Sequence, residues 1–177
     1  MNNSNKVKKM VFAALLTAFA IIIPIQFGFL KVIIPPFFTA TIASHVPMMI
    51  SMLISPIVAV VVGVGSGFGF LLTGLPLPVV FRAFTHVIVG LVGALIVIKS
   101  KSFKKAIIIT GPIHGILEAL VIIPFVGINN YPVITTTFIG ATIHHYVDGT
   151  IAFGLATAVA KSRRKNIYTA FNDNKAA

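Results

Sequence analysis

Long apolar runs, separated by short polar or proline- and glycine-containing segments, dominate the hydrophobic pattern of this 177-residue chain. Most of these runs approach the roughly 20 mainly apolar residues that a helix needs to cross a bilayer. They lack the alternation typical of a membrane β-strand. The pattern predicts an all-α polytopic membrane protein, with six transmembrane helices in one bundle. The expected spans are residues 10–25, 38–54, 56–72, 79–98, 105–126 and 133–160.

Polar and proline-containing segments set the expected limits of these spans. Ser55-Pro56 divides the second span from the third, because proline breaks the hydrogen bonding of a helix interior. We expect one transmembrane domain over residues 1–165 and a polar, mobile tail over residues 166–177. Residues 27–38, FGFLKVIIPPFF, form an apolar loop that we expect to fold back onto the bundle as a lid.

The charges indicate how the bundle is oriented. The chain is 57% hydrophobic and only 10% charged, yet its formal net charge is +11. Its cations gather before the first span, between the fourth and fifth spans, and after the sixth. With six spans these three clusters share one side, and the positive-inside rule makes that side cytoplasmic. We therefore expect both termini in the cytoplasm and attribute the basic charge to membrane topology, not to nucleic-acid binding.

Two kinds of chemistry are excluded by missing residues or motifs. The chain has no cysteine, so it can form neither a disulfide nor a thiolate metal site. It also lacks the GxxxxGK[ST] phosphate loop, so it cannot drive transport with ATP by itself.

Ionisable residues inside the apolar runs are the strongest functional signal, because such groups usually face a protein interior or a water-filled cavity. Three pairs, Arg82/His86, His114/Glu118 and His144/Asp148, are spaced i, i+4, so each pair shares a helix face. His145 and Tyr146 should point elsewhere. The full set is His45, Arg82, His86, His114, Glu118, His144, His145 and Asp148. We expect most of these side chains to converge on one polar cavity in the outer and middle parts of the bundle.

Two other interpretations of these residues remain open. In a small membrane scaffold protein, they would only hold helices together through hydrogen bonds. In a metal-ion permease subunit, His144 and Asp148 would bind a divalent metal. The sequence has no HExxH motif, and Arg82 nearby would repel a cation, so we expect no metal site.

The first span carries the motif that suggests a family. Lys8 to Pro24 read KKMVFAALLTAFAIIIP, in which Ala14 and Ala18 form an AxxxA pair that lets another helix approach closely. With its basic N-terminus, six spans and small size, the chain resembles the substrate-binding S component of an energy-coupling factor (ECF) vitamin transporter. The resemblance implies a non-enzymatic subunit of the bacterial cytoplasmic membrane without a cofactor. It also implies that Ala14 and Ala18 face a transmembrane coupling subunit that works with two ATP-hydrolysing subunits.

Within that family, the stretch from Ser44 to Gly90 is most similar to S components for niacin. Arg82 could hold the nicotinate carboxylate with two hydrogen bonds, and His86 or Tyr146 could contact the pyridine ring. Pantothenate and cobalamin remain alternative substrates. The predicted substrate-binding residues are Arg82, His86, Glu118, His144, Asp148, His45, Tyr146 and Asn130.

Overall fold

The computed structural model describes residues 3–36 and 38–171, and most of them are helical. The helices are α1 (Asn3–Gln26), α2 (Val46–Ser51), α3 (Pro56–Leu71), α4 (Leu77–Phe84), α5 (His86–Ser100), α6 (Phe103–Val126) and α7 (Tyr131–Ser162). They coincide with the predicted spans except the second, and α4 and α5 together make the fourth. Among the described residues, three helical segments are long and apolar enough to cross a membrane: Asn3–Gln26, Leu77–Ser100 and Phe103–Val126.

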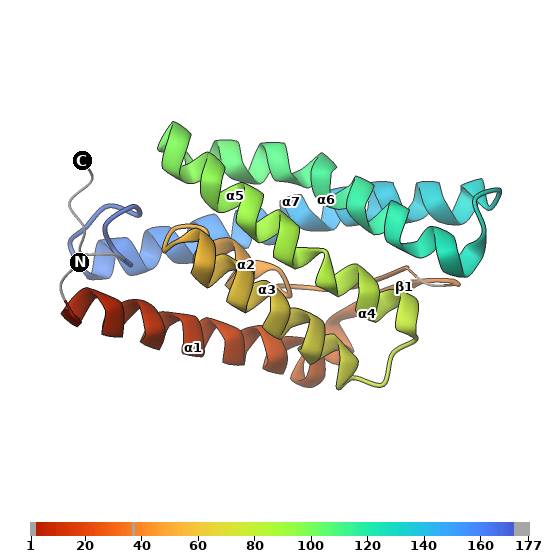
Figure 1. The fold of residues 1–177 in the computed structure, drawn as a ribbon, viewed down its shortest axis with the longest axis horizontal. Helices are drawn as coiled ribbons and strands as arrows, with labels where there is room; N and C mark the ends of the chain where they lie inside the picture. The colour runs from red at the N-terminus through yellow and green to blue at the C-terminus, as the bar shows by residue number, and fades with distance from the viewer. Residues whose placement is uncertain (1–2, 37, 172–177) are drawn as a thin grey trace.

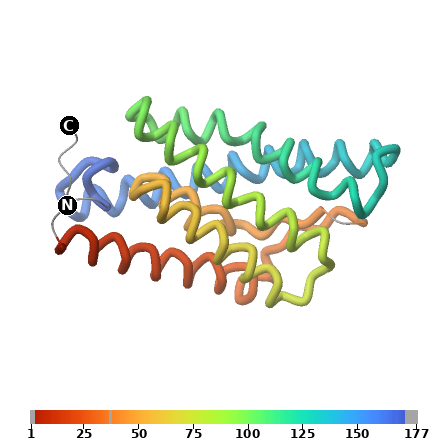
Figure 2. The backbone as a smooth tube through the Cα atoms, in the orientation of Figure 1, coloured from red at the N-terminus to blue at the C-terminus, as the bar shows by residue number. Residues whose placement is uncertain are grey.

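The helices lie roughly along one long axis, and neighbouring passes run in opposite directions (Figures 1 and 2). Helix α6 packs against α7, α1 against α3, and α5 against both α3 and α6. The start of α1 and the end of α7 lie at the same end of the bundle. The loop between α6 and α7 lies at the opposite end, where β1 (Lys31–Ile34) is also found.

Glycines on α3 allow its neighbours to approach closely. A Cβ atom at Gly63 would lie 2.7 Å from the Val87 Cα, and one at Gly69 would lie 2.7 Å from the Ile21 Cα. Such small residues let helix backbones pack directly against each other in lipid. Serine at position 55 caps the start of α3, since its side chain accepts a hydrogen bond from the Val58 N–H.

The second predicted span is wrong as a single helix. Residues 38–41 form strand β2 (Phe38–Thr41), and only the short α2 follows. Ala43, between them, has a positive φ of 69°, which a helix does not allow. Residue His45 therefore lies just before α2 and not two turns inside a helix.

The predicted lid segment contains a β-hairpin. Strand β1 pairs antiparallel with β2, with Lys31 opposite Thr41 and Ile34 opposite Phe38. The Phe38 ring packs so closely on α7 that a Cβ atom at Gly140 would lie 2.4 Å from it. Of the predicted segment, Phe38 packs onto α7, whereas Phe29, Val32 and Ile33 are more than half exposed. Strand β2, most of which lies beyond the predicted segment, contacts α7.

The apolar core occupies the end of the bundle that holds the start of α1. It is built from the middle of α1, α2, the start of α3, α5, the start of α6 and the end of α7. Part of the predicted tail joins this core: the Phe171 ring contacts Phe12 edge-on at 5.7 Å, and Tyr168 accepts a hydrogen bond from the Phe103 N–H. Residues 166–171 are thus packed and not extended, while 172–177 lie outside the described residues.

Candidate functional site

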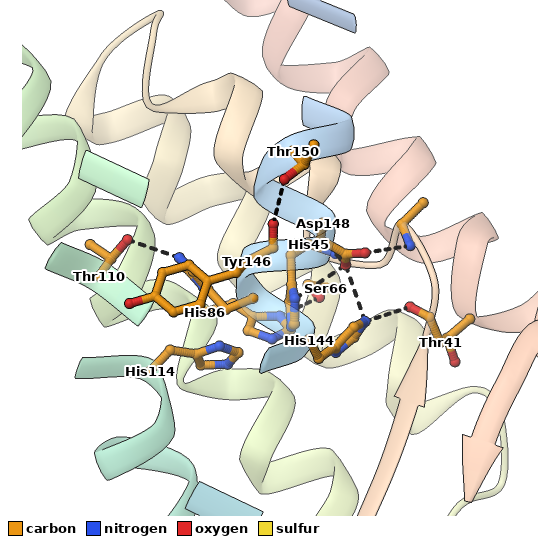
Figure 3. Close-up of polar contacts among 12 residues, drawn as sticks. Thr41, His45, Ser66, His86, Thr110, His114, His144, Tyr146, Asp148 and Thr150 are labelled. Carbon is orange, nitrogen blue, oxygen red and sulfur yellow. Dashed lines mark hydrogen bonds and ion pairs between the residues drawn. The ribbon is translucent and has the colours of Figure 1, made fainter. Parts of the chain in front are cut away.

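All five histidines of the chain meet inside the bundle, and Figure 3 shows four of them, His45, His86, His114 and His144. His45 lies at the centre, and its ring centre is 4.4 Å from His144 and 4.6 Å from both His86 and His114. The imidazole of His145 is 5.4 Å from that of His114. Four of the five are fully buried, and His144 is nearly so. Helices far apart in sequence therefore contribute to one polar cluster.

An ion pair between Arg82 and Glu118 forms one wall of this cluster. The Arg82 Nε and Nη2 atoms donate to the same carboxylate oxygen, Oε2, at 2.9 and 2.6 Å. Arg82 also donates to the Thr39 carbonyl at 3.2 Å, and its guanidinium lies 4.9 Å from the centre of the Phe38 ring. The other carboxylate oxygen, Oε1, lies 3.2 Å from the His114 Nε2. A buried ion pair is stable only when further hydrogen bonds satisfy both charged groups, as the Thr39 carbonyl and the His114 ring do here.

The second carboxylate, Asp148, holds the irregular chain between β2 and α2. Its two oxygens accept the backbone N–H groups of Ala43 at 2.8 Å and of His45 at 2.9 Å. The rings of His45 and His144 each place a nitrogen 3.2 Å from Asp148 Oδ2. These contacts explain why residues 42–45 leave helical geometry, because a buried carboxylate on α7 satisfies the N–H groups that a helix would otherwise bond.

The remaining polar contacts fix the orientation of individual rings. The Ser66 Oγ lies 2.7 Å from His86 Nδ1. The His144 Nε2 lies 3.1 Å from the Thr41 carbonyl, which can only accept, so this nitrogen carries a proton. His145 Nε2 bonds to the Thr110 Oγ1 at 3.0 Å, and this hydroxyl itself donates to the Ala106 carbonyl.

A small cavity lies between the hairpin and the histidines. Its volume is about 10 Å³, which is room for about one water molecule. The lining comes from β2, the segment before α2, and helices α3 to α7. It comprises Thr39, Thr41, Ser44, His45, Phe70, Val79, Arg82, Ala83, His86, Glu118 and His144. The site thus presents charged and imidazole groups to a space that must widen before an organic molecule can enter.

Comparison with known proteins identifies the family. The chain is 31% identical to the niacin transporter NiaX of Lactococcus lactis subsp. cremoris (strain MG1363) over an alignment of 175 positions. The alignment covers 89% of this chain and 77% of that protein. The chain belongs to the NiaX niacin transporter family. No family model and no solved structure matches it. Membership confirms the predicted resemblance to niacin-specific vitamin carriers and makes the chain a membrane transport protein and not an enzyme.

Most of the predicted binding residues come together in this cluster. The i, i+4 pairs His114/Glu118 and His144/Asp148 lie in contact, as their spacing predicts. Arg82 and His86 both line the cavity even though the chain changes from α4 to α5 between them. The described contacts therefore join Arg82, His86, Glu118, His144, Asp148 and His45 in one site.

Two predicted residues lie away from it. The Tyr146 side chain is 36% exposed, and its hydroxyl donates to the Ile108 carbonyl on α6. Asn130 precedes α7, where its carbonyl accepts from the Ile134 N–H. Within the described part of the chain, no hydrogen bond joins either side chain to the histidine cluster. Ala14 and Ala18 are exposed on the outer face of α1.

Other residues of the site were not in the predicted binding set. His114 was recognised as an ionisable residue in a span but was not assigned to binding, although it lies between His45, His86 and Glu118. Ser66 was not among the predicted functional residues. The signal available for Ser66 was its hydroxyl, the one polar side chain in the otherwise apolar helix α3.

Proposed function

We propose that this chain is the membrane-embedded substrate-binding (S) subunit of an ECF-type importer, and that its substrate is niacin in the nicotinate form. It crosses the bacterial cytoplasmic membrane six times, with both termini in the cytoplasm. The family relationship supports a niacin carrier. The common end for the start of α1 and the end of α7 supports an even number of passes.

The observation that carries the substrate proposal is the buried Arg82–Glu118 pair at the cavity. A carboxylate is the group that a guanidinium binds best, because two parallel N–H donors match two oxygens. When nicotinate enters, its carboxylate takes over donors that Arg82 now directs at Glu118 and at the Thr39 carbonyl. The surrounding imidazoles of His86 and His144 supply hydrogen bonds and ring contacts to the pyridine.

The hairpin is the part of the site that moves. Strand β2 supplies Thr39 and Thr41 to the cavity lining, and Phe38 covers the Arg82 guanidinium. A space of about 10 Å³ is far below the few hundred cubic ångströms of typical ligand pockets. Withdrawal of the hairpin from Gly140 on α7 opens the cavity from the end of the bundle opposite the start of α1 and the end of α7, which is the extracellular end.

Ligand binding to the purified chain in detergent tests the substrate. We expect nicotinate to raise the melting temperature, with stabilisation of about 2.7 kcal/mol at 100 times its dissociation constant. Nicotinamide, which differs by lacking the carboxylate, is the matched control and should bind at least about tenfold more weakly. Stabilisation by pantothenate or cobalamin alone would reassign the substrate. No stabilisation by any vitamin would favour a scaffold role.

The exposed AxxxA face tests the partner half of the proposal. Ala14 and Ala18 point outward, whereas Thr17 packs against Gly65 on α3. We expect Ala14→Trp to leave nicotinate binding and melting temperature unchanged, because an exposed substitution usually changes stability by less than about 0.5 kcal/mol. Copurification with the coupling subunit and cellular uptake should both be lost. Leu15→Trp, at an exposed site next to it, is the control. Uptake that survives Ala14→Trp would show that this face is not used.

A further inference from the structure

Four buried donor groups lie around one point of the histidine cluster. The ligand atoms of His45, His86, His114 and Glu118 are all within 4.8 Å of one another. Ligand atoms that share one ion at about 2.1 Å lie at most about 4.2 Å apart. Small rotations of the imidazoles would close the remaining difference.

The ring positions agree with a common centre. The His45 ring centre lies 4.6 Å from those of His86 and His114, and these two are 5.2 Å apart. Imidazoles bound to one ion through nitrogen at about 2.1 Å have ring centres about 4.5 to 5.2 Å apart. His114 has both ring nitrogens buried, and neither makes a hydrogen bond within the described residues, although Nε2 is 3.2 Å from Glu118 Oε1.

The outer partners orient the same four groups towards that centre. His86 has Ser66 at Nδ1, and His45 has Asp148 at Nδ1, so both rings keep Nε2 for the interior. Arg82 occupies Glu118 Oε2 and leaves Oε1 for a further partner. A carboxylate or hydroxyl on the second nitrogen is the usual support of a metal-binding histidine.

A second group of possible ligands, His45, His144 and Asp148, does not fit as well. Both Asp148 oxygens already accept backbone N–H groups, and the protonated His144 Nε2 faces the Thr41 carbonyl. His144 and Asp148 therefore support the site from outside it, while His45 belongs to the first group. The expectation that Arg82 would repel a cation also changes, because its charge is paired with Glu118 on the side away from His114.

We infer that His45, His86, His114 and Glu118 bind one divalent transition-metal ion. Imidazole and carboxylate ligands without thiolate suit Zn²⁺, Ni²⁺ or Co²⁺, whereas Mg²⁺ and Ca²⁺ prefer oxygen ligands. Counting the imidazoles as uncharged, Arg82, Glu118 and Asp148 leave the cluster with one net negative charge. A divalent ion changes that to one positive charge, which a single carboxylate then neutralises.

The ion is therefore the second positive group that receives the vitamin's carboxylate, and this step rests on the proposed function. A bound ion would explain how the site attracts an anion although Arg82 is already paired with Glu118. The ion stays in the protein and is not the transported solute, since four buried ligands and their outer partners hold it in place.

The test uses the full chain, purified in detergent through an affinity tag without histidine and treated with a chelator. Co²⁺ is titrated and followed by its visible absorption, and nicotinate binding is measured before and after the addition of Zn²⁺. We expect one Co²⁺ per chain and nicotinate binding at least about tenfold tighter with metal. His114→Gln should weaken Co²⁺ binding by at least about 100-fold, more than the 10- to 100-fold typical of an outer partner.

Two further variants test whether the loss of Co²⁺ binding in His114→Gln comes from unfolding. Ser66→Ala removes only the partner of His86 and should weaken Co²⁺ binding about tenfold in a protein that still melts cooperatively. Tyr168→Phe is the control, because it removes a polar contact with the Phe103 N–H at the apolar core, away from the four ligands, and its Co²⁺ affinity should be unchanged.

The outcomes separate the metal site from the proposed function. Failure to bind Co²⁺, or equal binding by wild type and His114→Gln, overturns the site. Bound metal with nicotinate affinity independent of it overturns the coupling and leaves the niacin proposal intact. Bound metal without nicotinate binding under either condition supports the site and overturns the niacin proposal. Uptake of the metal itself into cells would overturn its role as a resident ion.

Discussion

Glu118 and Asp148 are both buried carboxylates, yet they have different kinds of partners. Asp148 accepts two backbone N–H groups from the segment before α2 as well as contacting two histidine rings. Among the described residues, the ion pairs and hydrogen bonds of the Glu118 carboxylate go to side chains, those of Arg82 and His114. Glu118 lines the cavity, whereas Asp148 is not among its lining residues.

This difference indicates that Asp148 holds the site in shape, whereas Glu118 takes part in ligand binding. Backbone groups cannot leave Asp148 without unfolding the chain around Ala43, so its contacts must persist in every functional state. Side chains can exchange partners at the cost of a rotamer change, so Arg82 and His114 are free to turn from Glu118 to a ligand. One carboxylate therefore builds the site, and the other takes part in it.

The largest effect is expected for Asp148→Ala. The N–H groups of Ala43 and His45 would be buried without acceptors, at about 1 to 3 kcal/mol each, so the free energy of unfolding should fall by about 2 to 6 kcal/mol. Thermal unfolding in one detergent measures this. Asp148→Asn, which keeps one carbonyl oxygen, should lose roughly half as much. A stable Asp148→Ala protein with impaired binding would assign Asp148 to recognition instead.

The next effect is expected for Glu118→Gln. The amide oxygen can still accept hydrogen bonds from Arg82, but the acceptor is no longer charged. The free energy of unfolding should therefore fall by about 1.5 to 3 kcal/mol. Binding of Co²⁺ should fall much more than stability does. Thermal unfolding and Co²⁺ titration, both on the same preparation, measure the two effects. A larger loss of stability than in Asp148→Ala would reverse the comparison.

Local periodicity is what made parts of this site predictable. Residues spaced i, i+4 on one helix must share a face, so the pairs His114/Glu118 and His144/Asp148 followed from their spacing alone. The long apolar runs likewise predicted α1, α3, α6 and α7, and the pair α4–α5, because each run carries its own signal of length and hydropathy.

The segment before α2 could not be predicted in the same way. Its conformation depends on hydrogen bonds to Asp148, more than 100 residues away in sequence. The apolar character of residues 38–54 fits a helix, a buried strand or a buried turn equally well. Tyr146 points away from the face of His144 and Asp148, as its position in the helix predicts, because one residue along a helix turns the side chain by about 100°.

The smallest change in stability, and the sharpest test of the comparison, is expected for the double variant Arg82→Met/Glu118→Leu. Replacing a buried ion pair by apolar side chains of similar size is often neutral or stabilising, by up to about 4 kcal/mol, because neither charge has to be desolvated. The melting temperature should stay constant or rise, while nicotinate and Co²⁺ binding should both disappear. Each single variant would leave one buried charge unpaired and is the informative control.

A double variant that melts early would mean that the pair, like Asp148, holds the fold together. One that still binds nicotinate would place the vitamin elsewhere in the bundle, so only loss of binding in a stable protein supports the division between the two carboxylates.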